Sequence, residues 1–414
     1  MDAQKNAVVV IGPAWHSCGS YEVFKWQIRA FRDLGRQTYF LAVSPSMRYS
    51  SCWSDFWRNY YDMTNDLGVD HRGHASRARY LPFDLGFWRE LIPTYTRSYA
   101  YWRATVARLA KTPLNLQAFL QQHGTVDIVC NHYFNMPLAT RIRQKYPGSH
   151  IVLETHDIQS RHYSDQKLIH PFRRKVDEHE TLLADEIALA GDADILVHLN
   201  IAEGEFFSRR LPRTRHEILF PAAQRMHDRI KPNDSGMEAF DFLIVASSNY
   251  GNYKSVRWFL ENVWSEELAA RYTLKIVGKV DLEFTSRNDP IYDRFGSAFQ
   301  GRVDKLDSYY AATGLVLIPM IEGHGISIKT IEAMAFGKPI VSTSLGFRGF
   351  SEILDMSAVN SPADTPQEFL SAMLRYARAG YPRSDARLIQ LYENHFSPEA
   401  YRERYRAILN GLEK

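Results

Sequence analysis

The chain alternates short apolar runs with amphipathic stretches, and this alternation limits the possible folds more than any other feature. Near the amino terminus, the apolar run "NAVVVIGP" precedes "EVFKWQIRAFRDLG", which has helical spacing and ends at Gly35, a residue typical of a helix C-cap. The apolar run "QTYFLAV" follows, and later runs are "VDIVCNHY", "HIVLETHD" and "ADILVHL". Strand–helix–strand alternation of this kind predicts an α/β architecture with parallel sheets.

A second series of the same kind begins after residue 238, with "FDFLIVASSN", "VRWFLENVW", "YTLKIVGKV" and "YYAATGLVLIP". The length of 414 residues also exceeds that of one ordinary core. The pattern predicts two Rossmann-like domains, an N-terminal one over residues 1–222 and a C-terminal one over residues 239–390, joined by a polar linker over residues 223–238. Residues 391–414 are expected to form a C-terminal helix, and packing of this helix back on the N-terminal domain is considered.

The composition is that of a soluble globular protein without general affinity for nucleic acid, because the net charge is only +3 and 45% of the residues are hydrophobic. The 3 cysteines lie far apart without a CxxC pair, which indicates a reducing compartment and no zinc site or disulfide framework. The first apolar run has about six residues, too few for a signal peptide or a membrane span. We therefore expect a cytoplasmic protein, at most peripheral at the inner face of the plasma membrane.

The pattern breaks down between Pro45 and Gln121, where Tyr, Trp and Arg are frequent ("CWSDFWRNYYD", "FWRELIPTYTRSYAYWRATVARLAK"). We expect residues 45–121 to be an aromatic and basic elaboration of the N-terminal domain that shapes an acceptor site. Two interpretations remain open: the region is packing with a solvated face, or it docks on anionic lipid headgroups or a lipid-linked acceptor.

Polar residues crowd at the start of one predicted helix, in the stretch "PMIEGHGISIKTIEAMAFGKPIVSTSLGFRG". This helix is expected over about Ile326 to Ala335, between two short buried strands. Gly325 allows a backbone to approach a ligand closely, because it has no Cβ. Free N–H groups near Ser327 and Ile328, at the helix amino terminus, are suited to bind phosphate oxygens.

Two charged residues of the same helix extend this pattern. Lys329 adds a positive charge for phosphate, and Glu332 lies three residues further on the same helix face. A carboxylate accepts hydrogen bonds from two neighbouring hydroxyls, as a ribose presents them. Together these residues predict a site for a nucleotide diphosphate with its ribose. The alternative for Lys329 and for Glu332 is a solvated charge on a surface helix, and the alternative for Gly325 is a plain turn glycine.

This stretch, with "FLIVASSNYGNYKSVRWFLENVW", "LKIVG" and "FQGRVDKLDSYYAATGLVLIP" before it, resembles the retaining glycosyltransferases of the GT-B fold, most closely glycosyltransferase family 4 (group 1). The resemblance covers about Phe240 to Gly349, and the first half matches in outline only. It implies two Rossmann-like domains whose parallel sheets face an interdomain cleft. It also implies a metal-independent transferase that uses a nucleotide-sugar as co-substrate, with no cofactor.

The resemblance assigns roles to the residues of the second half. Lys329 and Glu332 are counted as catalytic, with Glu332 at the position that binds the donor ribose. The acid that touches the donor sugar in this family has two candidate positions here, Glu322 and His324, because His324 stands where the spacing expects the acid. The full set expected to bind the donor is Gly325, Ser327, Ile328, Lys329, Glu332, His324, Glu322, Arg302, Ser248 and Asn252.

In the first half, the resemblance places a histidine at a strand end facing the transferred sugar, and "LETHD" supplies His156 as the catalytic and acceptor-side candidate. A satisfied structural histidine is the alternative. Asp157 is the second acceptor-side candidate, with a helix N-cap as its alternative. Gly19 and Ser20 in "WHSCGSY" are expected to face the donor diphosphate, and His132 is a lesser candidate at another strand end.

The function expected from this resemblance is transfer of a hexosyl or related sugar from a nucleotide-sugar donor to a glycan or lipid-linked saccharide acceptor, in surface polysaccharide or glycolipid biosynthesis. A non-catalytic nucleotide-sugar or glycan-binding protein of the same fold is the alternative, and a GT-B sugar-nucleotide epimerase is a weaker one. A nicotinamide dehydrogenase is disfavoured, because no GxGxxG follows the first strand.

Overall fold

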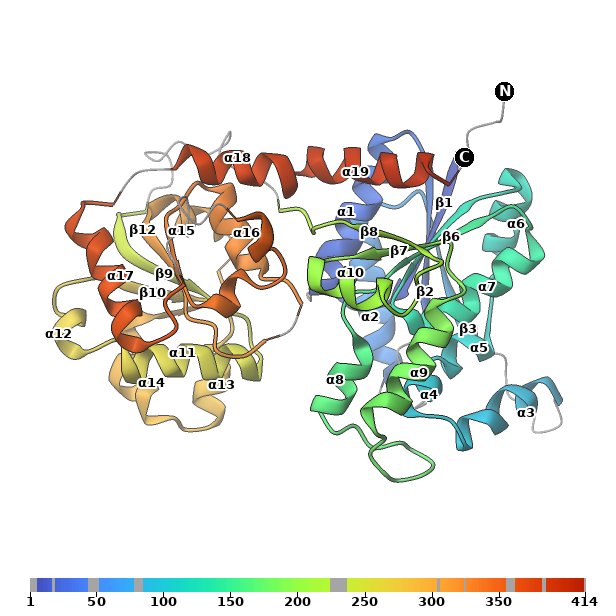
Figure 1. Cartoon of the computed structure of the whole chain (residues 1–414), viewed down its shortest axis with the longest axis horizontal. Helices are drawn as coiled ribbons and strands as arrows, with labels where there is room; N and C mark the ends of the chain where they lie inside the picture. Colours follow the sequence, from blue (N-terminus) through green and yellow to red (C-terminus); the bar gives the residue numbers. More distant parts are fainter. Residues whose placement is uncertain are drawn as a thin grey trace. The chain divides into compact units, whose positions relative to one another are not determined.

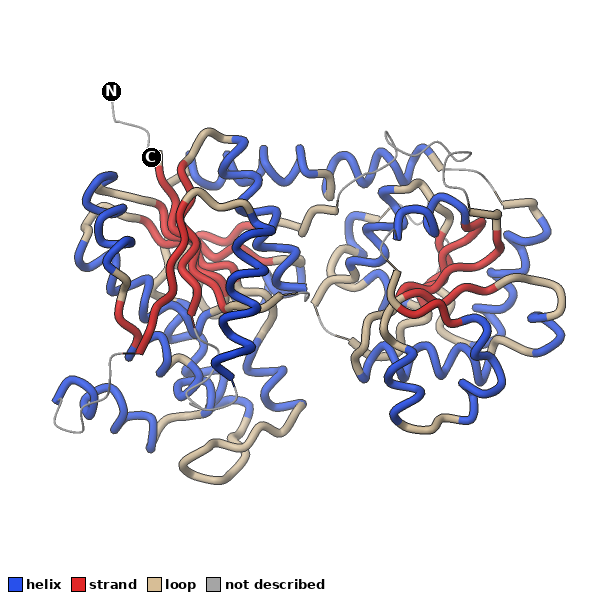
Figure 2. The backbone as a smooth tube through the Cα atoms, turned by 180° about the vertical axis from the view of Figure 1, so that it is seen from behind, coloured by secondary structure: helices blue, strands red, loops and turns tan. Residues whose placement is uncertain are grey.

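The structure of the protein is a computed structural model that describes residues 6–16, 19–43, 52–77, 85–223, 237–303, 306–323, 325–354, 362–381 and 385–412. The chain forms two compact units, each described here by itself. Unit 1 comprises Met1–Pro221 and Tyr401–Lys414, and unit 2 comprises Ala222–Ala400. In each unit a sheet lies between helices (Figures 1 and 2).

The sheet of unit 1 has the strand order β4-β3-β2-β1-β5-β6-β7-β8. Neighbouring strands from β3 to β8 pair in parallel, whereas the two-residue β4 pairs antiparallel with β3 at the edge. The strands are β1 (Ala7–Pro13), β2 (Gln37–Val43), β3 (His71–Arg77), β4 (Ala110–Lys111), β5 (Asp127–Asn131), β6 (His150–Glu154), β7 (Ile195–His198) and β8 (Arg215–Ile218). The helices are α1 (Gly19–Asp33), α2 (Cys52–Leu67), α3 (Leu85–Leu91), α4 (Tyr99–Arg103), α5 (Thr105–Leu109), α6 (Leu114–His123), α7 (Met136–Lys145), α8 (Gln159–Asp165), α9 (His179–Ala190) and α10 (Ile201–Ser208), with short 3₁₀ turns η1 (Ile92–Tyr95) and η2 (Tyr133–Asn135).

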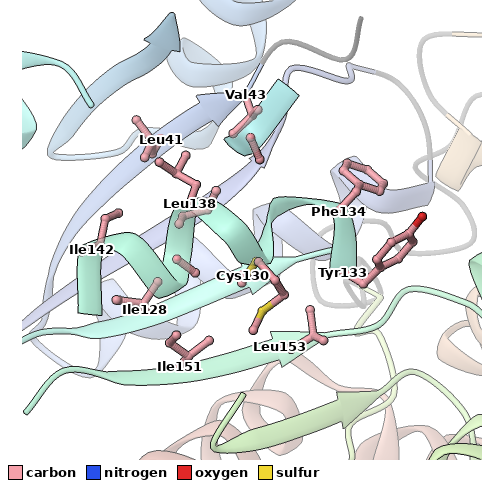
Figure 3. Packing of buried hydrophobic residues seen from close by; sticks show 14 of the residues in the cluster. Leu41, Val43, Ile128, Cys130, Tyr133, Phe134, Leu138, Ile142, Ile151 and Leu153 are labelled. Atoms are coloured by element: carbon pink, nitrogen blue, oxygen red, sulfur yellow. The ribbon is translucent and has the colours of Figure 1, made fainter. Parts of the chain in front are cut away.

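All seven residues of the central strand β1 are buried, as expected for a parallel sheet covered on both faces. Helix α7 covers part of one face, where its aliphatic side chains pack on the strands. The residues of this cluster shown in Figure 3 include Leu41 and Val43 of β2, Ile128 and Cys130 of β5, Leu138 and Ile142 of α7, and Ile151 and Leu153 of β6.

The expectation that residues 45–121 lack a regular pattern is wrong for the part that the structure describes. This region forms α2, a parallel strand and several short helices. The strand, β3, reads "HRGHASR", and its polar sequence hides it from a search for apolar runs. It lies against β2, where a Cβ at Gly73 would come within 2.0 Å of the Tyr39 hydroxyl. Residues 44–51 and 78–84 lie outside the described residues.

The end of the chain returns to unit 1 through helix α19 (Pro398–Asn410). The ring of Tyr405 packs edge-on against Phe31 of α1, with 4.8 Å between the ring centroids. Its hydroxyl donates a hydrogen bond to Oε1 of Glu154, at 3.1 Å. The last helix is therefore anchored at the end of β6 through a buried polar contact.

The sheet of unit 2 has five parallel strands in the order β11-β10-β9-β12-β13. The strands are β9 (Phe240–Val245), β10 (Leu274–Val277), β11 (Phe299–Gly301), β12 (Thr313–Ile318) and β13 (Ile340–Ser342). The helices are α11 (Tyr250–Asn262), α12 (Glu266–Ala269), α13 (Asp281–Ser286), α14 (Pro290–Phe295), α15 (Leu306–Ala312), α16 (Ile328–Ala335), α17 (Pro366–Arg378) and α18 (Ala386–His395), with 3₁₀ turns η3 (Gly296–Ala298), η4 (Ser344–Phe347) and η5 (Ser351–Ile353). Most of the predicted linker, residues 224–236, lies outside the described residues.

The strand order of unit 2 reverses between β9 and β12. The chain moves from β9 outward through β10 and β11, and then crosses back to place β12 on the other side of β9. In open α/β sheets, the crevice at such a switch point, outside the carboxyl ends of the strands, is the usual ligand site. Within the described part of the chain, no helix has the length and apolar character needed to cross a bilayer.

Candidate functional site

The residues predicted to bind the donor follow the carboxyl ends of three strands of unit 2. Ser248 and Asn252 belong to the β9–α11 connection and the start of α11, and Arg302 is exposed directly after β11. Glu322, Gly325 and the start of α16 follow β12. Because the strands are parallel, these connections meet at one edge of the sheet, and the β9 and β12 connections lie on either side of the switch point. His324 lies outside the described residues.

The start of α16 has the geometry of an anion-binding helix terminus. Gly325 has a φ of 66°, in the left-handed region that favours glycine, and the helix begins at Ile328. The side chain of the N-cap residue Ser327 accepts no hydrogen bond from a backbone N–H of the first turn among the described residues. Its hydroxyl instead lies 2.8 Å from that of Thr330, which donates to the carbonyl of Gly346 at 2.6 Å. The N–H groups that a first helical turn leaves without intrahelical partners are therefore not capped by Ser327.

Lys329 reaches across the switch point. Its Nζ donates to Oδ1 of Asn252 at 2.9 Å and lies 3.4 Å from Sδ of Met320. Burial, together with the nearby charge of Arg348, lowers the pKa of Lys329 to about 8, while Glu332 acts in the opposite direction. A cation that is partly desolvated and held by a neutral amide is well suited to bind an incoming anion, because the anion would restore its charge balance.

Glu332, one turn further along α16, contacts a residue that the sequence analysis did not single out. The Tyr310 hydroxyl of α15 donates to Oε2 of Glu332 at 2.9 Å. Tyr310 is buried and stacks on Phe336, and burial followed by the charge of Glu332 raises its pKa well above the usual value. The contact fixes one carboxylate oxygen of Glu332, which is half-buried.

Glu322 is engaged in an ion pair with Lys254 of α11, with 2.7 Å between Nζ and Oε2. The next residue, Gly323, has a φ of 154°, and a Cβ at this position would come within 3.1 Å of the Arg348 guanidinium. Arg348 is the second residue that the sequence analysis missed. It follows η4, after β13, and the only sequence signal for it is that β13 ends at the same edge of the sheet.

The phosphate candidates on the β9 side differ in their surroundings. Asn252 is buried, and its Nδ2 donates to the carbonyl of Ser247 at 2.9 Å, which leaves Oδ1 for Lys329. The hydroxyl of Ser248 donates to Oε1 of Glu283 at 2.8 Å. The structure thus brings Asn252 to Lys329, whereas Ser248 is directed to the α13 side.

In unit 1, the structure brings together two histidines at the ends of neighbouring strands. His132 follows β5 and His156 follows β6, and both have a positive φ, 64° and 59°. Their rings stack with 4.2 Å between centroids, and both side chains are buried. Burial lowers the pKa of His156 to about 3, and burial followed by His156 and Arg103 lowers the pKa of His132 well below its usual value. Both imidazoles are therefore neutral at physiological pH.

A pair of buried amides fixes the orientation of His156. Its Nε2 lies 2.7 Å from Oδ1 of Asn131, which also accepts a hydrogen bond from Nε2 of Gln27 at 2.8 Å. Asn131 returns a bond from Nδ2 to Oε1 of Gln27 at 3.0 Å. Because Oδ1 of Asn131 can only accept, the proton of the neutral imidazole is assigned to Nε2, which leaves Nδ1 as an acceptor.

The other two predictions for the N-terminal loop fall at the start of α1. The Ser20 hydroxyl lies 3.3 Å from Nε2 of His132, so this residue joins the histidine pair. Gly19 is exposed, and a Cβ at this position would meet no atom within 4 Å. No atom of the described residues thus requires a glycine here.

The interpretation of Asp157 as a helix N-cap is wrong. Helix α8 begins at Gln159, and its first N–H groups are capped from α9 by Glu186, which accepts from Gln159 at 3.0 Å and from Ser160 at 2.7 Å. Asp157 is half-buried and lies beside the buried carboxyl group of Glu203. Burial, and next the charge of Asp157, raises the pKa of Glu203 well above its usual value.

Comparison with known proteins identifies the second unit. Residues 239–378 match the family model described as glycosyl transferases group 1. Unit 2 carries a group 1 glycosyltransferase domain. No curated protein sequence matches the chain.

Solved structures resemble the chain over its whole length. Sucrose-phosphate synthase from Thermosynechococcus elongatus has 14% sequence identity and a TM-score of 0.63, with 98% of this chain and 99% of that chain covered. HepE of Anabaena in complex with UDP and glucose has 12% identity and a TM-score of 0.66, with 99% and 100% covered. A UDP-forming trehalose-phosphate synthase from Burkholderia xenovorans has 13% identity and a TM-score of 0.58, with 99% and 100% covered. At these identities the likeness shows the fold.

Together these findings confirm the prediction of a GT-B fold with two parallel α/β sheets. The match of residues 239–378 to the group 1 model also confirms the prediction of a glycosyltransferase enzyme. Membership of family 4 and the stereochemical outcome stay predictions.

Proposed function

We propose that the chain transfers a sugar from a nucleotide-diphosphate sugar to a hydroxyl group of a glycan or lipid-linked saccharide, with retention of the anomeric configuration. The observation that carries the proposal is the contact between Lys329 and Asn252 across the switch point of unit 2, inside the group 1 domain. This contact holds the ammonium group of Lys329 beside the amino terminus of α16, which Ser327 does not cap. A helix amino terminus of this kind binds phosphate in many α/β proteins.

In this proposal, unit 2 holds the donor. The diphosphate accepts hydrogen bonds from the first-turn N–H groups of α16 and from Lys329, with Arg348 as a further cation at the same edge. The ribose hydroxyls donate to the carboxylate of Glu332, whose Oε2 also accepts a hydrogen bond from the Tyr310 hydroxyl. As the bond from the anomeric carbon to the diphosphate breaks, negative charge grows on the leaving oxygen, and these groups stabilise it.

Unit 1 supplies the acceptor side. Neutral His156 offers Nδ1 to a sugar hydroxyl, because Asn131 holds its Nε2. The acceptor hydroxyl attacks the anomeric carbon, the bond from that carbon to the diphosphate oxygen breaks, and the hydroxyl proton passes to this leaving oxygen as the nucleoside diphosphate departs. By resemblance, the product belongs to a surface polysaccharide or glycolipid, and the protein works in the cytoplasm, with peripheral contact at the inner face of the membrane.

The proposal includes catalysis without a metal ion or cofactor, since Lys329, Arg348 and the helix terminus supply the positive charge that a divalent cation supplies elsewhere. Turnover of the donor should be the same in a chelator as in Mg²⁺. A loss of turnover in the chelator that Mg²⁺ restores would contradict this part of the proposal.

The nucleotide is tested by thermal denaturation. HepE above is in complex with UDP and glucose, and the trehalose-phosphate synthase above is UDP-forming. UDP is therefore the first nucleotide to be compared with GDP and with UMP. A ligand that binds only the folded state at a hundredfold excess over Kd stabilises it by about 2.7 kcal/mol. We expect a clear increase of Tm with one diphosphate and little with its monophosphate; no increase with any nucleotide would reject the proposal.

A non-catalytic nucleotide-sugar-binding protein of the same fold is the second candidate, because Glu322 is paired with Lys254 rather than directed at Lys329. Slow hydrolysis of the donor sugar separates the two. The wild type should hydrolyse donor, Lys329→Ala should lose at least about a hundredfold in rate, and Lys279→Ala, an exposed lysine after β10, should retain it. Donor binding without any turnover in the wild type would favour the second candidate.

A further inference from the structure

Large apolar side chains are exposed in two segments of unit 1 that meet each other. The first segment, residues 85–95, carries Leu85 (85% exposed), Trp88, Ile92 (59%) and Tyr95; the second, residues 169–176, carries Ile169 (61%), Phe172 and Val176. The rings of Tyr95 and Phe172 stack with 4.3 Å between centroids. Both α3 and the loop between α8 and α9 lie at the same end of unit 1 (Figure 1). These seven residues are called the apolar end of unit 1.

The first segment presents its apolar face outward. Leu85, Trp88 and Ile92 follow helical spacing along α3 and into η1, and all three are exposed. Among the residues of this stretch whose burial the structure describes, Leu91 and Thr94 are buried. A surface helix of a soluble protein normally turns its polar face to water, so this pattern points to a partner.

The second segment is a loop whose backbone is fixed by hydrogen bonds. Ile169 and Val176 form an antiparallel bridge, and the N–H of His170 donates to the carbonyl of Lys175 at 2.8 Å. The buried ring of His170 accepts at Nδ1 from the N–H groups of Phe172 and Arg173, each at 3.2 Å. Because these bonds fix the backbone, the exposed side chains cannot be explained as an unstructured loop.

The loop also carries positive charge. Lys167, Arg174 and Lys175 are exposed, Arg173 is paired with Asp177, and no acidic residue occurs between positions 167 and 176. A second copy of the chain would bring the same cations together and be repelled. A surface that carries negative charge above an apolar layer would bind both the exposed cations and the exposed apolar side chains.

We propose that the apolar end of unit 1 docks on the surface of an anionic lipid bilayer, with Ile169, Phe172 and Ile92 in the headgroup boundary and Lys167, Arg174 and Lys175 on the lipid phosphates. Trp88 and Tyr95 have the amphipathic rings that favour this boundary. The biological role of this docking, which is to bring unit 1 to a lipid-linked acceptor, rests on the proposed function. Binding to lipid is measured independently of transfer.

The test is sedimentation of the full chain with vesicles of phosphatidylcholine alone and of phosphatidylcholine with phosphatidylglycerol. Wild type should bind the anionic vesicles more tightly, and salt should weaken this binding. Each cation near an anionic surface contributes about fivefold in partitioning, so Arg174→Ser with Lys175→Ser should weaken binding about thirtyfold. Ile169→Ser with Phe172→Ser should weaken it at least about tenfold.

The matched control is Leu114→Ser with Leu282→Ser, which removes two other exposed leucines, 82% and 53% exposed, and should bind as the wild type does. The inference is overturned if wild type binds both vesicle types equally, or if the Ile169→Ser, Phe172→Ser variant binds as tightly as wild type. It is also overturned if the wild type forms a dimer that this variant abolishes, because a second copy would then cover the surface.

The same variants separate this inference from the proposed function. All of them should keep the Tm increase with a nucleoside diphosphate, because the substituted side chains lie in solvent and outside the donor site. If no nucleotide raises the Tm of the wild type although the wild type binds anionic vesicles, the proposed function alone is rejected. If a nucleoside diphosphate raises the Tm but the wild type does not prefer anionic vesicles, the lipid surface alone is rejected.

Discussion

Nε2 of His156 lies 2.7 Å from Oδ1 of Asn131, and both side chains are buried at the carboxyl edge of the unit 1 sheet. Asn131 is itself held by Gln27 through two hydrogen bonds. The imidazole therefore has one orientation and one tautomer, and its Nε2 is held by a neutral amide. Such an arrangement positions Nδ1 without making the ring basic.

We predict that Asn131→Ser lowers turnover of the donor about 10- to 100-fold and leaves the dissociation constant of the nucleoside diphosphate unchanged, because it frees the His156 ring without touching unit 2. Discontinuous assays of donor consumption measure the turnover, and calorimetric titration measures the dissociation constant of the nucleoside diphosphate. The control is Asn200→Ala, which removes a buried N-cap of α10 in the same unit. Equal losses of turnover in the two variants would mean that Asn131 acts through general stability only.

The lowered pKa of Lys329 predicts a pH dependence of donor binding. With a pKa of about 8, Lys329 is mainly protonated at pH 7 and loses its proton as the pH rises above 8. The neutral amine binds a diphosphate poorly, so kcat/KM for the donor should fall about tenfold for each pH unit above 8. A pH–rate profile between pH 6 and 10 measures this. Lys329→Arg, whose guanidinium stays charged, should lose the alkaline fall; a profile identical to that of wild type would contradict the assignment.

The contact between Tyr310 and Glu332 predicts how the ribose is recognised. Glu332→Gln should weaken binding of UDP about 10- to 100-fold, because hydrogen bonds to a charged acceptor contribute about 1.5–3 kcal/mol. It should also abolish the preference for UDP over 2′-deoxy-UDP. Titration calorimetry with both nucleotides measures the affinity and the preference.

Two further variants limit the interpretation of the Glu332 experiment. Tyr310→Phe removes the hydrogen bond to Oε2 and should change the affinity by much less, since the carboxylate remains. Glu283→Gln alters another carboxylate at the same edge, one that accepts from Ser248, and should leave the preference for the 2′-hydroxyl intact. A preference that survives in Glu332→Gln would remove Glu332 from the ribose site.

The sequence was informative wherever a local pattern determines the structure. The apolar runs predicted β1, β2, β9 and β12, since buried parallel strands consist of apolar residues. The helix predicted from about Ile326 is α16, which begins at Ile328, and Ile331 and Met334 are buried as its spacing requires. Gly325 was singled out because it has no Cβ, and the structure gives it a φ of 66°, in the left-handed region that favours glycine.

The sequence was uninformative where a contact depends on distant residues. Asn131 pairs with Gln27, 104 positions away, and Lys329 with Asn252, 77 positions away, and no local pattern encodes either pair. Strand β3 was missed because it lies beside β2 with a polar sequence, and Asp157 was misread because α8 takes its cap from Glu186 on another helix. The position of a helix start can be read locally, whereas the group that caps it cannot.

Glu154 allows a test of the buried end of β6. Burial raises its pKa to about 7, against hydrogen bonds with Gln27 and Tyr405 that lower it, and Oε2 has no hydrogen-bond partner among the described residues. Between pH 4.5 and pH 7, the folded protein therefore binds more protons at this site than the unfolded chain does. The contribution of Glu154 to the free energy of unfolding is present at low pH and is lost as the pH rises toward and above 7.

We therefore predict that Glu154→Gln increases Tm at pH 8, because it removes a buried charge while an amide oxygen remains to accept from Tyr405. The gain should be about 1–3 kcal/mol, or several degrees in Tm. At pH 5, where the carboxyl group is protonated in the folded state, wild type and variant should melt within about a degree of each other. Thermal denaturation at both pH values measures the difference. A variant that is less stable than wild type at pH 8 would show that the ionised carboxylate, rather than its neutral form, holds α19 through Tyr405.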